Sequence, residues 1–446
     1  METLSIHSND RASGKTKLER LGKRAMCDKD TVFNNLGHLI DETLLIASYQ
    51  ELDRSKAVGI DGETKGTYGS KLYENIQSLI HRIHTGTYKP KPARIVEIPK
   101  EDGSTRPLVI SCFEDKLVQS AVNKILTAIY EPVFLNCSYG FRPNKNCHDA
   151  LRALTKHTYP FWDGAVVEID IKKCFNTIPH KELHEILKKK ISDSRFLKLI
   201  SKLVNAPIIV NGEHVTNKNG CPQGSIISPI LANIFLHEVI DLWFLETCDN
   251  HLTGAAKEVR YADDMVFAFQ KYLDAKRFFK VLPKRLQKYG LKMHETKSNL
   301  IKSGQNAARA AYRQGTRLPT YQFLGFTVYW GLARNQKWWR MKYTSRRDRL
   351  NAKLNGLSNF LRKELNSQDT VKTLNTVKRV MIGWLNYHSI SDNERRVNGF
   401  IRSCRWIILK WINRRGRKRP MNWTTLLNLL DTLKFPRYWK TTSMFT

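Results

Sequence analysis

Residues 259–269 (VRYADDMVFAF) place two acids, Asp263 and Asp264, inside an apolar run with the composition of a β-strand. We expect a hairpin with one strand on either side of this acidic tip, because a carboxylate is costly to bury unless it is paired or bound to a metal. A third acid, Asp170, lies at the end of the apolar segment 164–171 (GAVVEIDI), which predicts a short buried strand. Acids at a strand end and at a hairpin tip meet when the two strands are neighbours in a sheet.

Three converging carboxylates would suit two Mg²⁺ ions about 3.5–4 Å apart, the spacing of two-metal phosphoryl-transfer sites. Mg²⁺ prefers a few hard oxygen ligands and completes its shell with substrate phosphates. The alternative is that Ala-Asp-Asp is simply a polar turn, and an Asp-Asp pair alone does not decide between the two interpretations.

The charge of the chain indicates a polyanionic partner. Its 446 residues, enough for two or three domains, carry 74 Lys and Arg against 41 Asp and Glu, a formal net charge of +33. Phosphate backbones are the usual partners of such an excess, because neutralising each phosphate releases a counterion. Solvated surface lysines and an anionic membrane surface are weaker alternatives.

Other compositional features exclude several classes of protein. No apolar run reaches the roughly 18 residues of a membrane span, and the polar N-terminus carries no signal-peptide core. The eight cysteines form no CxxC pair, so we expect no zinc site and reduced thiols in a cytoplasmic protein.

The pattern of elements predicts a mixed α+β protein. We expect helices over 31–90, 113–135, 148–157, 180–205, 225–247 and 272–289, and strands over 94–110, 164–171, 207–218, 259–269, 291–302 and 321–330. Near residue 340 the composition becomes helical, basic and Trp-rich. We therefore divide the chain into five regions: a basic N-terminal arm (1–30), a mixed N-terminal region (31–165), the region with the three acids (166–340), a helical region (341–405) and a basic tail (406–446).

Several segments resemble, in order, the motifs of reverse transcriptases. YADD at 261–264 resembles the catalytic box of that family, and the remaining matches are IPKEDGSTRPL (98–108), SYGFRPNKNCHDAL (138–151), EIDIKKCFNTI (168–178), GCPQGSIISPILANIFL (220–236), GLKMHETKS (290–298) and FLGF (323–326). The resemblance implies a right-hand polymerase. Its fingers would lie within 31–165, its palm, built on an antiparallel sheet, over 166–340, its α-helical thumb and maturase domain over 341–405, and a DNA-binding tail over 406–446.

The subfamily is also suggested by motifs. QGSIISP together with YADD is similar to bacterial group II intron-encoded proteins, and IGWLNYHS (382–389) resembles the signature of their maturase domain. The expected Asp of the first catalytic motif is Asn176 here, but that position is not a metal carboxylate. RPLVIS (106–111) replaces the commoner RPLGIP, which is a minor change.

The resemblance assigns roles to the acids and to two cations. Asp170 and Asp263 would hold the metal ions and Asp264 would support them. Lys100 and Arg106 would grip the incoming triphosphate, as a point charge and a planar fork. The alternative is that these two are solvated surface cations.

Further residues would shape the nucleotide site. Phe175 matches the bulky ring that lies under the sugar and would exclude a 2′-hydroxyl, favouring dNTPs; the alternative is a core Phe. Gln223 and Gly224 would line the nucleotide pocket, the glycine allowing close backbone approach. Lys297 would contact the primer strand or the triphosphate.

The C-terminal third carries clustered cations. Residues 402–419 contain eight cations and no acid, with Trp406 and Trp411 interleaved. The spacing of Trp406 also fits the core face of an amphipathic helix, which we favour. We expect nucleic-acid binding by two groups of residues, one beginning a basic helix and one near the end of the chain: Arg346, Arg347 and Arg349, and Arg414, Arg415, Arg417, Lys418 and Arg419.

The resemblance therefore implies an RNA-directed DNA polymerase that binds its parent group II intron RNA, assists splicing and supports retrohoming. No endonuclease pattern of paired cysteines and histidines follows residue 404, so we expect cDNA synthesis from an existing DNA 3′ end. Expected partners are intron RNA, target or primer DNA and dNTPs, with a homodimer open, in a bacterial cytoplasm and on the nucleoid. A host-adopted reverse transcriptase serving defence or repair, and a splicing-only maturase, remain as alternatives.

Overall fold

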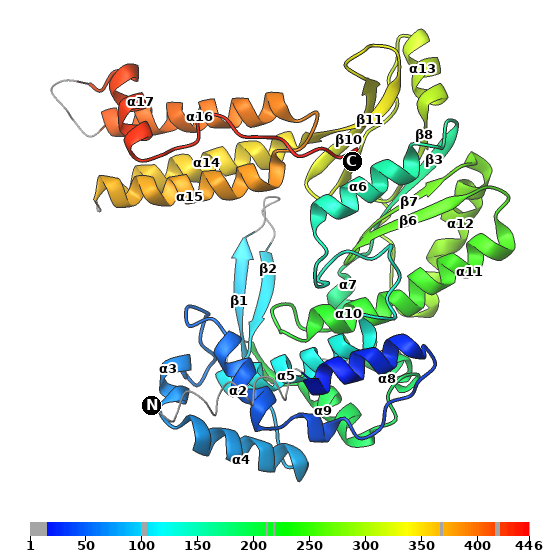
Figure 1. Ribbon diagram of the computed structural model, residues 1–446, viewed down its shortest axis with the longest axis vertical. Coiled ribbons are helices and arrows are strands. Elements are labelled where there is room, and N and C mark those ends of the chain that lie inside the picture. The colour runs from blue at the N-terminus through cyan, green and yellow to red at the C-terminus, as the bar shows by residue number, and fades with distance from the viewer. Residues whose placement is uncertain are drawn as a thin grey trace.

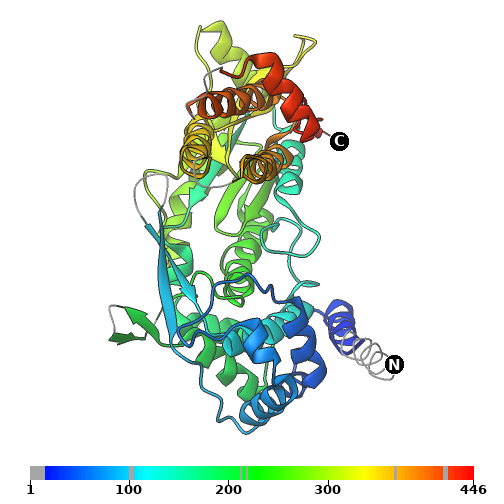
Figure 2. The same cartoon turned by 90° about the vertical axis from the view of Figure 1, so that its left-hand side faces the viewer.

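Layers of helix and sheet follow one another along an elongated molecule. The computed structural model describes residues 16–99, 105–210, 213–216, 219–365, 369–414 and 420–445. An N-terminal layer lies at one end, a four-stranded central sheet in the middle and a helical bundle at the other end (Figures 1 and 2). The mixed composition and the antiparallel sheets agree with the predicted α+β class.

The N-terminal layer packs helices around α5 (Phe113–Tyr130), whose residues are buried on nearly every side. A helix over 16–27 also packs here through the partly buried Leu18 and Leu21. The described part of the basic N-terminal arm expected over 1–30 is therefore an element of this layer, because its apolar side chains join the core. The surrounding helices are α2 (Glu42–Glu51), α3 (Lys65–Gly69), α4 (Leu72–His84), α8 (His180–Lys188) and α9 (Ser194–Val204), with a 3₁₀ turn η1 (Gly37–Leu39).

A small sheet rises from this layer. β1 (Ala93–Pro99) and β2 (Thr105–Ile110) form an antiparallel pair, and β1 also pairs in parallel with β4 (Ile208–Val210), which pairs with β5 (Glu213–Val215). The hairpins predicted over 94–110 and 207–218 are both present. Their tips, at 100–104 and 211–212, lie outside the described residues.

The central sheet has the order β6-β7-β3-β8 and separates two cores. Alternating side chains of β7 divide between them: Met265, Phe267 and Phe269 join the core of the N-terminal layer, and Val266 joins the opposite one. The strands are β3 (Gly164–Asp170), β6 (Ala256–Tyr261), β7 (Asp264–Phe269) and β8 (Asn299–Ser303), and the helices around them are α6 (Cys147–Thr158), α7 (Cys174–Thr177), α10 (Ser228–Leu236), α11 (Leu242–His251), α12 (Tyr272–Lys288) and α13 (Gln305–Arg313).

The helix predicted over 225–247 is continuous but irregular. A π-helical turn, η2 (His237–Asp241), joins α10 to α11. By length and composition the stretch Ser228–His251 would also suffice to cross a membrane, although 72% of its most apolar window is buried inside the protein. Counting uninterrupted apolar residues missed this stretch because isolated acids interrupt it. Its burial is that of a core helix.

A three-stranded sheet connects the central sheet to the bundle. The strand predicted over 321–330 is two strands, β9 (Tyr321–Phe323) and β10 (Phe326–Leu332), because Leu324 and Gly325 both have positive φ and reverse the chain. β10 pairs with β11 (Trp339–Ser345), which the sequence did not predict. The boundary expected near 340 therefore moves to the end of β11.

Four helices form the bundle: α14 (Arg347–Glu364), α15 (Thr370–His388), α16 (Glu394–Asn413) and α17 (Trp423–Thr432). One apolar core unites them, from Leu350 to Phe435. The domain boundary expected at 405/406 is wrong, since it falls inside α16 and α17 shares the same core. Trp406 is 59% exposed rather than buried, because other residues of α16 supply its core face.

The chain after α17 returns to the central part of the molecule (Figure 1). Ser391 N–H donates to the Thr442 carbonyl (2.9 Å), and Thr442 N–H donates to the Ser389 carbonyl (2.8 Å). Met444 is then 1% exposed, within the core that contains β9–β11 and one face of the central sheet. The segment expected to be a basic tail is thus partly an element of the junction between bundle and sheet.

Candidate active site

Strand register brings three carboxylates to one end of the central sheet. β3 and β7 are antiparallel neighbours, and Asp170 lies directly opposite Asp264. In the β6–β7 hairpin Tyr261 pairs with Asp264, so Ala262 and Asp263 form a two-residue turn. Ala262 has φ +57°, as the favoured two-residue hairpin turns require. The structure thus brings together the three acids that the sequence singled out.

The surroundings leave this turn little freedom. A Cβ added at Gly140 would lie 2.4 Å from the backbone nitrogen of Ala262, so only glycine fits beside the turn. Asp170 is braced at its backbone, where its N–H donates to Ser298 Oγ (3.2 Å) and its carbonyl accepts from His294 N–H (2.8 Å).

The carboxylates repel one another. Partial removal from water, followed by the negative charges of Asp263 and Asp170, raises the pKa of Asp264 to about 7. Burial and the charge of Asp170 also raise the pKa of Asp263. Asp264 nevertheless keeps access to solvent. Like-charged oxygens at an accessible site favour a bound cation, and carboxylates are the hard ligands that Mg²⁺ and other hard divalent cations prefer.

Lys297 lies at the edge of this group. Its Nζ is 3.5 Å from Asp170 Oδ2, and its side chain is 61% exposed. The pair is therefore open to solvent and easily exchanged for another anion or cation. The strand predicted over 291–302 begins only at Asn299, since the preceding residues form the loop that carries Lys297 and braces Asp170.

The predicted nucleotide residues come from two segments that touch. Val109 N–H of β2 donates to the Gln223 carbonyl (2.7 Å), and a Cβ on Gly224, which has φ +102°, would lie 2.6 Å from the Val109 carbonyl oxygen. On the same strand Arg106 is exposed, and its charge lowers the pKa of Asp263 against the raising effects of burial. Lys100 lies outside the described residues.

Phe175 contacts the segment that carries Gln223 and also the loop beside the Ala262–Asp263 turn. Its carbonyl accepts from Cys221 N–H (2.6 Å), and its ring meets the ring of Phe141 edge-on at 6.5 Å between centroids. Phe141 lies 6.5 Å from Tyr261 as well, is 57% exposed and has φ +56°. Sequence reasoning did not single out Phe141, because a phenylalanine in a loop gives no signal of a strained, exposed ring.

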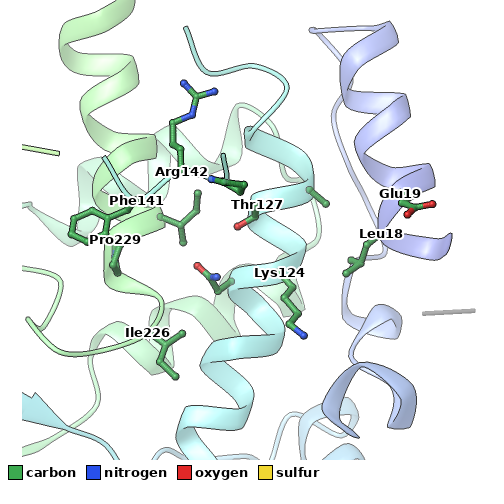
Figure 3. A pocket seen from close by; sticks show the side chains of 12 residues that line it. Leu18, Glu19, Lys124, Thr127, Phe141, Arg142, Ile226 and Pro229 are labelled. Atoms are coloured by element: carbon green, nitrogen blue, oxygen red, sulfur yellow. The ribbon is translucent and has the colours of Figure 1, made fainter. Parts of the chain in front are cut away.

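A cavity of about 620 Å³ is lined in part by Phe141. It lies between the helix over 16–27, α5 and α10, and Figure 3 shows Leu18, Thr127 and Pro229 among its lining side chains. It contains none of the three aspartates. The carboxylate geometry, and not this hollow, therefore locates the candidate active site.

The predicted nucleic-acid contacts divide into two places. Arg347 and Arg349 are exposed on the first turn of α14, and the charge of Arg349 lowers the pKa of Asp264, so this turn borders the carboxylates. Arg346 pairs with Asp348. Arg414 caps the C-terminal end of α16, with its guanidinium 5.3 Å from the Trp411 ring. In Figure 1 this end of α16, next to α17, points away from the central sheet. The remaining predicted cations, Arg415, Arg417, Lys418 and Arg419, lie outside the described residues.

Comparison with known proteins agrees with this geometry. A family model described as reverse transcriptase (RNA-dependent DNA polymerase) matches residues 98–328, just over half of the chain. The matched span contains all three aspartates and the segments that surround them. The chain belongs to the reverse transcriptase family. Members of this family generally use divalent metal ions.

Individual relatives indicate which members of the reverse transcriptase family this chain resembles. This reverse transcriptase is 39% identical to the group II intron-encoded protein LtrA of Lactococcus lactis subsp. cremoris, over 50% of this chain and 37% of that protein. It is 36% identical to an uncharacterized 91 kDa protein in the cob intron of Schizosaccharomyces pombe, over 50% of this chain and 28% of that protein. Protein YkfC of Escherichia coli is 36% identical, over 46% and 53% of the two chains. The matches span roughly half or less of each relative. The predicted resemblance to group II intron-encoded reverse transcriptases is confirmed.

Asp264→Asn should stabilise the metal-free protein at alkaline pH. Asp264 binds its proton more tightly in the folded protein, with a pKa of about 7, than in the unfolded chain, where an Asp titrates near about 3.9. Stability is therefore lost as the pH rises through 7 and Asp264 ionises. In EDTA at pH 8 the variant should melt roughly 1–3 °C higher, and the gain should shrink at pH 5.

Thermal denaturation at the two pH values measures this difference. Saturating Mg²⁺ should raise the melting temperature of the unaltered protein more than that of the variant, since the ion binds only the folded state. Equal melting temperatures at pH 8 would contradict the raised pKa of Asp264 in the folded protein.

Proposed function

We propose that this chain is an RNA-directed DNA polymerase that also binds a group II intron RNA and assists its splicing. The observation that carries the polymerase proposal is the convergence of Asp170, Asp263 and Asp264 from two adjacent strands. In this proposal the N-terminal layer with the β1–β2 hairpin serves as fingers, the central sheet as palm, and the bundle as thumb and maturase domain.

The three acids fit a pair of Mg²⁺ ions, with Asp170 and Asp263 as ligands and Asp264 in support. Bound Mg²⁺ would lower the barrier to attack by a primer 3′-hydroxyl and neutralise charge on the departing pyrophosphate. Lys297 is paired with Asp170 in the structure and would contact the primer strand or the triphosphate at the same place.

The neighbouring segments provide for nucleotide binding. Arg106, whose charge already acts on Asp263, and Lys100 would grip the triphosphate. Gln223 and Gly224 pack on the same strand as Arg106 and would line the pocket. Phe175 would lie under the sugar, where its ring would collide with a 2′-hydroxyl.

The proposed maturase role rests on three features. The net charge of +33 favours a polyanionic partner. The segment 382–389 resembles the maturase signature, and one relative is named as a group II intron-encoded protein. In the structure this segment joins the bundle to the turn between β9 and β10, where Tyr387 Oη donates to the Leu324 carbonyl (2.8 Å). Retrohoming by target-primed reverse transcription would follow from both activities together.

Asp263→Ala should abolish primer extension on an RNA template with dNTPs and Mg²⁺. Loss of one metal carboxylate should lower the rate by roughly 10²–10³-fold or more, since electrostatic stabilisation of the transition state is lost. Asp249→Ala, at an exposed acid on α11, is the matched control and should leave the rate unchanged. If the unaltered protein extends nothing while promoting splicing, the polymerase proposal is wrong and a splicing-only maturase remains.

Phe175→Ala should relax the choice of sugar. Removing the ring opens space for a 2′-hydroxyl, so the ratio of rNTP to dNTP incorporation should rise by roughly 10-fold or more, with dNTP incorporation retained. Single-nucleotide incorporation kinetics with matched dNTP and rNTP measure the ratio. An unchanged ratio would leave Phe175 as a core side chain only.

Replacing Arg415, Arg417, Lys418 and Arg419 by Gln should weaken binding of intron RNA. The slope of log affinity against log salt should become shallower by roughly 0.7–0.9 for each phosphate that the variant no longer neutralises. Filter binding at several salt concentrations measures the slope. The control removes four exposed cations of α12, Lys276, Arg277, Lys280 and Lys284. Equal weakening in both variants would show only a general effect of net charge.

A further inference from the structure

A fully buried arginine lies beneath the catalytic turn. Arg260, on β6, is 0% exposed and is among the largest side chains that the described part of the protein buries completely. Its Nε and Nη2 donate to the two carboxylate oxygens of Asp241, each at 2.6 Å. This two-pronged pair fixes the plane of the guanidinium.

The helix irregularity explains how Asp241 reaches this position. Asp241 is the last residue of the π-helical turn η2, which adds a residue to the helical repeat between α10 and α11. Such bulges often accompany functional sites, because they turn a side chain away from the regular face. One helical segment thus provides Asp241 and, from α10, Asn233.

Asn233 connects the arginine to the other side of the turn. Its Oδ1 accepts from Arg260 Nη1 (2.9 Å), and its Nδ2 donates to the Gly140 carbonyl (2.8 Å). Gly140 is the residue whose backbone lies against Ala262 without room for a Cβ. Asn233 therefore sets the position of the segment that limits the turn from outside.

Arg260 also contacts the turn itself. Nη1 lies 3.3 Å from the carbonyl oxygen of Ala262, the residue that has positive φ and precedes Asp263. A non-glycine residue in this region is held there by its surroundings. The peptide bond between Ala262 and Asp263 thus accepts a hydrogen bond from the charged guanidinium of Arg260. The backbone of Gly140 packs against the same turn.

The network is not itself arranged for a metal ion. Ligand atoms of Cys137, Asp241 and Glu258 lie within 4.8 Å of one another. Both oxygens of Asp241, however, already accept from Arg260. Burial and the charge of Asp241 raise the pKa of Glu258 well above its ordinary range, which disfavours the ionised form that a metal ion would need. The guanidinium therefore occupies the place that a cation would need.

We propose that Arg260, Asn233 and Asp241 are positioning residues that hold the Ala262–Asp263 turn in the orientation in which Asp263 meets a divalent cation. The inference rests on the proposed metal-dependent polymerase. A buried ion pair adds little net stability compared with well-packed apolar side chains, so stability is a weak reason for these groups. Groups that orient metal ligands in this way commonly change metal affinity or activity by roughly 10–100-fold when they are altered.

Two substitutions release the turn by different routes. Arg260→Lys keeps the charge but loses the fork that joins Asp241, Asn233 and Ala262. Asn233→Ala keeps the ion pair and removes only the hydrogen bonds of Asn233 with Arg260 Nη1 and with the Gly140 carbonyl, so it provides the test if Arg260→Lys fails to fold. Arg82→Lys is the matched control, because Arg82 forms a similar two-pronged pair with Glu114 in the N-terminal layer.

Metal binding is measured without turnover, by electron paramagnetic resonance of Mn²⁺ added to the metal-free protein. We expect Asn233→Ala and Arg260→Lys to weaken Mn²⁺ binding by roughly 10-fold or more, with a matching rise in the Mg²⁺ concentration needed for half-maximal primer extension. The Km for template–primer should be unchanged. Arg82→Lys should lower the melting temperature and leave both metal measurements unaltered.

The outcomes separate this inference from the proposed function. If both variants melt lower but bind Mn²⁺ as the unaltered protein does, the network is only structural and the inference is overturned. If the unaltered protein binds Mn²⁺ but extends no primer, the polymerase proposal fails, while weaker binding by the two variants still supports the positioning role.

Discussion

Asp170, Asp263 and Asp264 repel one another, and the surrounding structure has to hold their carboxylates together against this repulsion. Strand register sets Asp170 opposite Asp264, and a hairpin turn with a strained Ala262 places Asp263 beside them. Burial first, and then the negative charges of Asp263 and Asp170, raise the pKa of Asp264, so its ionised form is disfavoured where the fold places it. Such a site gains a strong preference for cations at some cost in stability, a compromise typical of active sites.

The parts of this site that depend on local pattern could be predicted from the sequence. Asp263 and Asp264 interrupt an apolar run, and Asp170 ends one, so their place at strand ends follows from the cost of burying charge. The partners of Arg260 could not be predicted, because Asp241 reaches it only through a π-helical turn. The influence of Arg349 on Asp264 depends on how the bundle meets the sheet, which no local pattern encodes.

In the bundle too, local sequence pattern predicts the helices, but tertiary packing decides which side chains are buried. Its helices follow from amphipathic spacing, yet that spacing placed Trp406 in the core. Val397, Phe400, Ile401 and Cys404 supply the buried face of α16 instead, and the Trp406 ring lies against Trp423 near the surface, 5.2 Å between centroids. The return of Met444 to the core of the sheet was also not predictable, because the last segment has no periodicity that would signal burial.

That return determines how the bundle is attached. The chain enters the bundle after Ser345, and it comes back beside Ser389 and Ser391 at Thr442. Asn393, 0% exposed, links the same place by accepting from Ser345 N–H (2.8 Å) and donating to the His388 carbonyl (2.8 Å). Entry and exit therefore lie at one joint, which contacts between Arg340 and Asp392 and between Tyr387 and Leu324 also cross. A force on the distant end of α16, next to Arg414, would act on the residues of this joint.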